Sequence, residues 1–138
     1  MTVGISTSVK NAALSGIRAL IDSGPAGGRI KIYDAPRPAT GVAITTQTLL
    51  ADLEMASDAP GSFADPVAGS MALRLPVTDN AADATGTAVW ARITDSVGNF
   101  VLDIDVGDLL SGAELKLPVT TITLGGTVNV VSGSISIS

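Results

Sequence analysis

The sequence predicts a mainly β protein, an antiparallel β-sandwich or jelly roll of about eight strands with one N-terminal α-helix. Three observations predict it. From residue 29 onward, apolar side chains recur at every second position in short segments. Glycine and proline turns separate these segments at intervals of roughly 8–15 residues. Only one segment, before residue 24, has helical spacing. Antiparallel pairing is expected because no helices lie between the later strands. A partly open barrel is the alternative architecture.

The 138 residues are expected to form a single domain, with an arm at residues 1–7 and a helix at residues 8–23. Ser6 or Ser8 is the expected N-cap, and Gly24-Pro25 stops the helix. An apolar stripe runs along this helix at Val9, Ala13, Ile17, Leu20 and Ile21. We expect the stripe to pack on the sheet; the alternative is a docking surface for a neighbouring subunit.

The β-sandwich is predicted over residues 29–137. Its first strand, Arg29 to Tyr33, places Ile30 and Ile32 on the core face. Residues 35–47 and 57–69 are rich in proline and glycine, which predicts two loops. The last strand changes its apolar phase near Ser132-Gly133, as a β-bulge does. With the arm, the two loops are the segments expected to reach neighbouring molecules.

Residues Thr85 to Gly107 predict a β-hairpin with its turn at residues 95–99, where Gly98 can adopt a positive φ. The hairpin holds the single tryptophan, Trp90. Packing on the sheet is the ordinary role of such a residue. The alternative is an interface anchor, because Trp and Arg are enriched at binding hot spots. The interface candidates are Trp90, Arg92, Tyr33 and Arg37.

Charge is scarce in this chain. Charged residues make up 15% of it, against about 25% in a typical soluble domain. This predicts that much of the surface faces other protein subunits, since interface cores are depleted in charge; an ordinary small β domain rich in Ala and Thr is the alternative. The net charge of −5 argues against nucleic acid and anionic membranes as partners.

The residue types also restrict the chemistry. The chain has no cysteine and no histidine, which removes disulfides and the common nucleophile–base pairs. Asp103, Asp105 and Asp108 form one acidic cluster that could hold Ca²⁺ through oxygen ligands. Their alternation with apolar residues favours a solvated strand face instead. We therefore expect no enzyme activity, no cofactor and no metal.

Several segments resemble a family of small virion proteins from tailed bacteriophages, over about residues 8–137. They are the helix with Ala12-Ala-Leu14 and Leu20-Ile-Asp22, then Gly-Gly-Arg-Ile-Lys-Ile-Tyr33, Leu49-Leu-Ala-Asp-Leu53, the stretch Ala84 to Asn99, and a closing strand rich in Thr, Val and Ser.

The resemblance implies a head decoration, or cement, protein of jelly-roll type. Such a protein would bind the outer capsid surface and clamp neighbouring major capsid proteins, with itself as a further partner in a dimer or trimer. It would lie on the capsid exterior, and in the host cytoplasm during assembly. The alternatives are a tail, collar or fibre-base structural protein, and a carbohydrate-binding jelly-roll module.

Overall fold

A computed structural model describes residues 3–137. Within them the chain is mainly β with one helix, as the sequence predicts, and it forms eleven strands where about eight are expected. The elements are α1 (Thr7–Ile21), β1 (Arg29–Tyr33), β2 (Leu49–Glu54), β3 (Ser70–Ala72), β4 (Thr78–Asp79), β5 (Gly86–Thr87), β6 (Trp90–Thr94), β7 (Phe100–Gly107), β8 (Leu115–Lys116), β9 (Thr121–Ile122), β10 (Val128–Asn129) and β11 (Ser132–Ser136).

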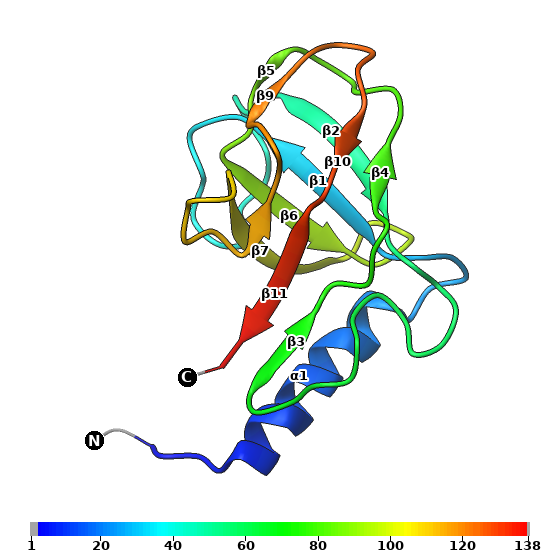
Figure 1. Ribbon diagram of the computed structural model, residues 1–138, viewed down its shortest axis with the longest axis vertical. Coiled ribbons are helices and arrows are strands. Elements are labelled where there is room, and N and C mark those ends of the chain that lie inside the picture. Colours follow the sequence, from blue (N-terminus) through cyan, green and yellow to red (C-terminus); the bar gives the residue numbers. More distant parts are fainter. Residues whose placement is uncertain (1–2, 138) are drawn as a thin grey trace.

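Seven strands form one sheet in the order β2-β1-β6-β7-β8-β11-β3, and two ribbons, β10-β4 and β5-β9, accompany it (Figure 1). The sheet is mixed, because β7 and β8 pair in parallel. That corrects the expectation of antiparallel pairing throughout. Only two residue pairs join these strands, so the short loop between them suffices where a longer ladder needs a long crossover. The arrangement is consistent with a β-sandwich, and a jelly-roll connection remains a prediction.

The hairpin predicted over Thr85 to Gly107 is present as β6 and β7. Its turn is tied by Asp95, whose carboxylate accepts hydrogen bonds from the backbone N–H groups of Val97 (3.0 Å) and Asn99 (2.9 Å). Gly98 has φ +95°, a region that a side chain disfavours. The hairpin is therefore fixed at its tip by local bonds as well as along its ladder.

All five residues of β6 are buried. Ala91 and Ile93 belong to the main hydrophobic core, which they share with Ile30 and Ile32 of β1. The opposite face of β6 is covered by other parts of the chain, because its residues on that face are buried as well. β6 is thus enclosed on both faces, as a central strand is in a layered fold.

The last strand is interrupted at residues 130–131, just before the β-bulge predicted near Ser132-Gly133, and forms two separate strands rather than one bulged strand. β10 pairs with β4, whereas β11 pairs with β8 and β3. At Gly133 a Cβ atom would lie 3.0 Å from Leu73 and 3.2 Å from Leu115. A glycine is needed there because these two buried side chains approach the backbone closely.

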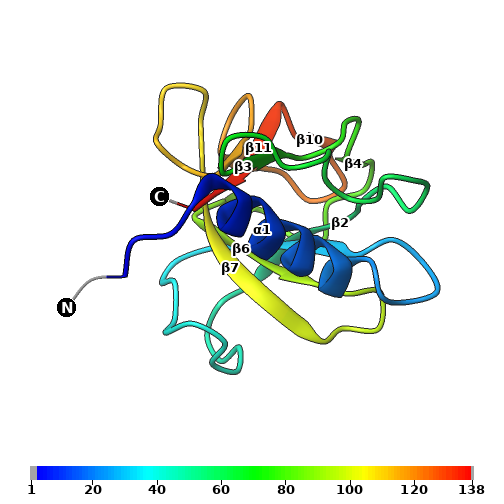
Figure 2. The same cartoon turned by 90° about the horizontal axis from the view of Figure 1, so that it is seen from below.

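The helix lies at one end of the molecule, beside β3 and β11 on one side and near β7 on the other (Figure 2). Ser6 is the N-cap, and its hydroxyl accepts a hydrogen bond from the N–H of Val9 at 3.2 Å. Leu14 and Ile21 are buried and Ile17 is half-buried. The predicted stripe is therefore wrong in its phase, because Val9, Ala13 and Leu20 face solvent.

The loop at residues 57–69 determines which side of the helix faces the rest of the domain. Its contacts hold the side that carries Asn11, Arg18 and Asp22, rather than the predicted apolar stripe. Three helix-side contacts make the attachment: Asn11 accepts from the N–H of Gly69 (2.9 Å), Arg18 donates to the carbonyl of Phe63 (3.1 Å) and to Asp65 (2.9 Å), and Asp22 accepts from the N–H of Ser62 (3.2 Å). The loop expected to reach neighbours is thus docked on its own chain.

Two leucines on the helix provide a direct test of its orientation. Leu14 is fully buried and Leu20 is exposed, so Leu14→Ala should lower the free energy of unfolding by about 2–5 kcal/mol. Leu20→Ala is the matched control and should change it by less than about 0.5 kcal/mol. Urea unfolding at low protein concentration measures both values. Equal losses would contradict the observed helix phase.

Candidate functional site

The four interface candidates lie together on the outer face of β1 and β6, the face opposite the main core. The rings of Tyr33 and Trp90 stack with their centroids 4.9 Å apart and their planes 18° from parallel. The Arg92 guanidinium lies 5.3 Å from the centroid of Trp90 and 5.2 Å from that of Phe100, within cation–π range of both rings. Arg37 approaches the same face from the loop at residues 35–47.

A bidentate ion pair lies at the centre of this group. Nε and Nη2 of Arg92 donate to the two carboxylate oxygens of Asp103 at 2.8 and 3.1 Å. The side chains are 10% and 0% exposed, respectively. The hydrogen bond to Asp103 raises the pKa of Arg92 further above its ordinary value. A charge buried this deeply requires its partner, because unpaired burial of either group is strongly unfavourable.

The loop at residues 35–47 closes over this pair. The N–H of Gly41 donates to Asp103 Oδ2 at 3.0 Å, and Arg37 donates to the carbonyl of Asp103 at 3.1 Å and to the carboxylate of Asp105. Gly41 has φ +76°, and a Cβ there would lie 3.2 Å from the Phe100 ring. The loop is therefore held on the sheet, although the sequence suggested a segment free to reach a neighbour.

This geometry gives three of the four candidates an internal role, whereas Arg37 stays exposed. Trp90 has no exposed surface, and its indole N–H donates to the carbonyl of Asp34 at 3.0 Å. Tyr33 and Arg92 are also buried. Trp90 accordingly offers no surface to a partner in this structure, and packing on the sheet is the role it has. We call Tyr33, Trp90, Arg92, Phe100 and Asp103 the arginine–aromatic cluster.

The three acidic candidates for a metal are directed to different partners. Asp103 binds Arg92, Asp105 binds Arg37, and Asp108 accepts a hydrogen bond from the N–H of Leu110 (3.0 Å) within its own turn. Among residues 3–137 there is no group of three acidic, His or Cys side chains placed to hold an ion.

The interpretation of a solvated strand face is wrong for Asp103, whose side chain is fully buried. The turn position alone does not reveal the pair, because a regular hairpin with Thr94 opposite Phe100 would place Arg92 opposite Leu102. A shift in register between Ile93 and Thr94 brings Asp103 opposite Arg92 instead.

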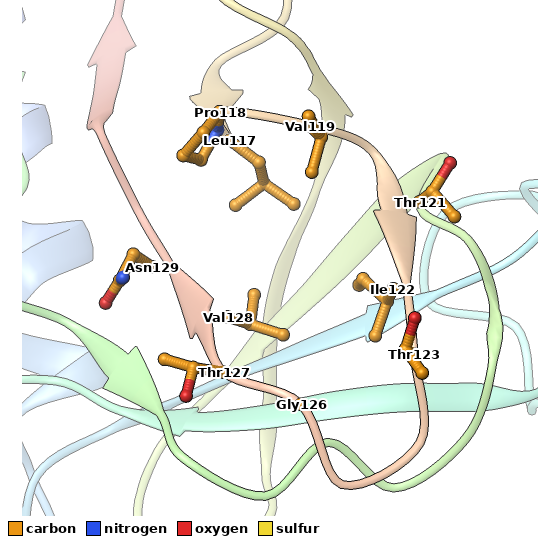
Figure 3. A pocket seen from close by; sticks show the side chains of 10 residues that line it. All are labelled: Leu117, Pro118, Val119, Thr121, Ile122, Thr123, Gly126, Thr127, Val128 and Asn129. Atoms are coloured by element: carbon orange, nitrogen blue, oxygen red, sulfur yellow. The ribbon is translucent and has the colours of Figure 1, made fainter.

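A second feature, which sequence reasoning missed, is a hollow between β9 and β10 (Figure 3). It has a volume of about 340 Å³, and neither charged nor aromatic residues line it. Leu117, Ile122 and Val128 are buried beneath it, and Val119 on its wall is exposed. An uncharged, largely apolar concavity suits an apolar segment of another molecule. Sequence reasoning treated these residues as ordinary short strands.

A third feature is the solvent-facing side of α1, which we call the outward helix face. Most of its exposed residues are apolar or glycine, namely Val9, Ala12, Ala13, Gly16, Ala19 and Leu20; Thr7 and Ser8 in the first turn are the exposed polar residues. Surface helices normally present charged or polar residues on this side. Val9 is 50% and Leu20 is 61% exposed. The helix therefore has apolar residues both toward the body and away from it.

Comparison with protein-family models, with curated proteins and with solved structures finds no match for this chain. Within the described residues, α1 is too short and insufficiently apolar to cross a membrane.

The single tyrosine of the chain gives a test of the cluster. Burial raises the pKa of Tyr33 above its ordinary value of about 10. Its contribution to stability is therefore complete below about pH 10 and is lost as the pH rises through the folded-state pKa. Tyrosinate absorbance should titrate at higher pH in the folded chain than in concentrated urea, with Trp90 fluorescence reporting that the chain remains folded. Identical midpoints would contradict the burial of the phenol.

Proposed function

We propose that this chain is a structural protein of a bacteriophage virion, a decoration protein that binds the outer capsid surface and bridges neighbouring major capsid proteins. One observation carries the proposal beyond the sequence resemblance. Two uncharged, largely apolar surfaces lie on one domain, the hollow between β9 and β10 and the outward helix face of α1. Figure 1 shows β9 and β10 at one end of the molecule and α1 at the other.

Two separated contact surfaces are what a bridging protein needs. Each surface is free of charge and largely apolar, and the central parts of protein interfaces are likewise depleted in charge. The main core joins them, since residues of β1, β2, β6, β8 and α1 belong to one cluster. A force applied at one surface is thus transmitted to the other through packed side chains rather than through a flexible linker.

The proposal is tested with capsids of the phage that encodes the chain, prepared without it. Added protein should bind to the capsid exterior at saturable sites, located by electron cryomicroscopy, and should raise the temperature at which the particles release DNA. Val119→Asp places a charge on the wall of the hollow and should weaken this binding at least about tenfold, because the charge would be desolvated in the complex.

Val97→Asp is the matched control. Val97 is also exposed, but it lies in the β6–β7 turn rather than at the hollow, so this variant should bind as the unchanged chain does. Density for the chain only on the tail, or no saturable binding to capsids, would overturn the proposal. Equal weakening by both variants would show that the hollow is not the contact.

A further inference from the structure

The outward helix face carries no charged side chain, because the helix directs its two charged residues elsewhere. Lys10 and Arg18 are the charged residues of α1. The aliphatic part of Lys10 lies against Gly69. Arg18 donates to the carbonyl of Phe63 and to the carboxylate of Asp65. Both cations therefore point toward the loop at residues 57–69, and two such faces could approach one another without burying a charge.

The spacing along this face is self-complementary. Val9, Ala13, Gly16 and Leu20 lie at intervals of four, three and four residues, which places them in one line along a helix. The pattern is symmetric about its midpoint, with a large residue at each end and small residues between. When two copies are laid antiparallel, Val9 of each copy meets Leu20 of the other, and Ala13 meets Gly16.

We propose that the outward helix face binds a second copy of this chain in an antiparallel helix pair with two-fold symmetry. A two-fold interface requires one surface to be complementary to itself, and the line from Val9 to Leu20 meets that requirement. Ala13 and Gly16 let the two backbones approach closely at the centre, while Val9 and Leu20 bury their side chains at the ends.

This inference deepens the proposed function: the helix pair would join two copies, and each copy would contact a capsid protein through its β9–β10 hollow. Pairing through the helix face is measured on the isolated chain, so its failure is distinguishable from a failure of capsid binding. α1 has 15 residues and is therefore about 22 Å long. A contact of this length falls at the small end of specific interfaces. We expect a reversible dimer whose population rises with protein concentration. Its two β9–β10 hollows would lie at the far ends, away from the helix pair.

Cysteine cross-linking tests the register of the helix pair. Because the chain has no cysteine of its own, only the introduced residues can form a disulfide. Positions 9 and 20 lie about 16 Å apart along one helix, too far for a disulfide, which needs Cα atoms about 4.4–6.8 Å apart. The double variant Val9→Cys/Leu20→Cys can therefore form the bond only between copies. Mild oxidation should give a reducible dimer at least about fivefold more abundant than with either single variant.

Two results of the cross-linking experiment would contradict the antiparallel pair. Efficient dimer from Val9→Cys alone would indicate parallel pairing, and equal yields from all variants would indicate random collision; either result overturns the proposal.

A second experiment needs no cross-link. Sedimentation equilibrium of the unchanged chain should show a monomer–dimer equilibrium, and Leu20→Lys should raise its dissociation constant at least about tenfold by placing a charge in the interface. Leu110→Lys is the matched control, since Leu110 is 97% exposed in the loop after β7. It should leave the equilibrium unchanged. A monomer at every concentration, or equal effects of both substitutions, would overturn the proposal.

Discussion

The ion pair between Arg92 and Asp103 is the interaction on which the outer half of this structure depends. It joins β6 to β7, since the two residues face one another in the hairpin register. Its carboxylate also accepts a hydrogen bond from the N–H of Gly41 and so helps to hold the loop at residues 35–47 over the sheet, next to the bonds from Arg37 to the backbone carbonyl of Asp103 and to the carboxylate of Asp105. Removing both charges from water is costly, and the bidentate geometry, the two flanking rings and the bond from Gly41 offset that cost.

This arrangement determines which residues remain for binding. Most of the residues usual at interface hot spots, namely Trp90, Tyr33 and Arg92, are buried in covering one face of the sheet. The β9–β10 hollow and the outward helix face, which remain for partners, are therefore uncharged and without aromatic residues. Such surfaces gain from burial of apolar area and supply little electrostatic steering. That suits contacts formed at high local concentration, as in an assembled particle.

Sequence reasoning succeeded where local physics decides the structure. Ser6 caps the helix, and Gly98 takes a positive φ in the hairpin turn. The irregularity predicted near Ser132-Gly133 is present as a break at residues 130–131, although the sequence predicted a bulge rather than two strands. Each of these features depends on a few neighbouring residues, so the pattern alone identifies it.

Sequence reasoning failed where contacts between segments far apart in the chain determine the structure. The helix phase is set by bonds from Asn11 and Arg18 to a loop about 50 residues later. Asp103 looked solvated because the loop at residues 35–47, which covers it, lies about 60 residues earlier. The hollow was missed because its walls, β9 and β10, are placed by pairing with β5 and β4 rather than with each other.

The most direct test of this account is the free energy of unfolding of Asp103→Ala, measured in urea from the fluorescence of Trp90, the single tryptophan. Asp105→Ala is the comparison, because Asp105 also pairs with an arginine but is largely exposed. The account predicts a loss of about 3–5 kcal/mol for Asp103→Ala and of less than about 1 kcal/mol for Asp105→Ala. A small and equal loss in both variants would contradict it.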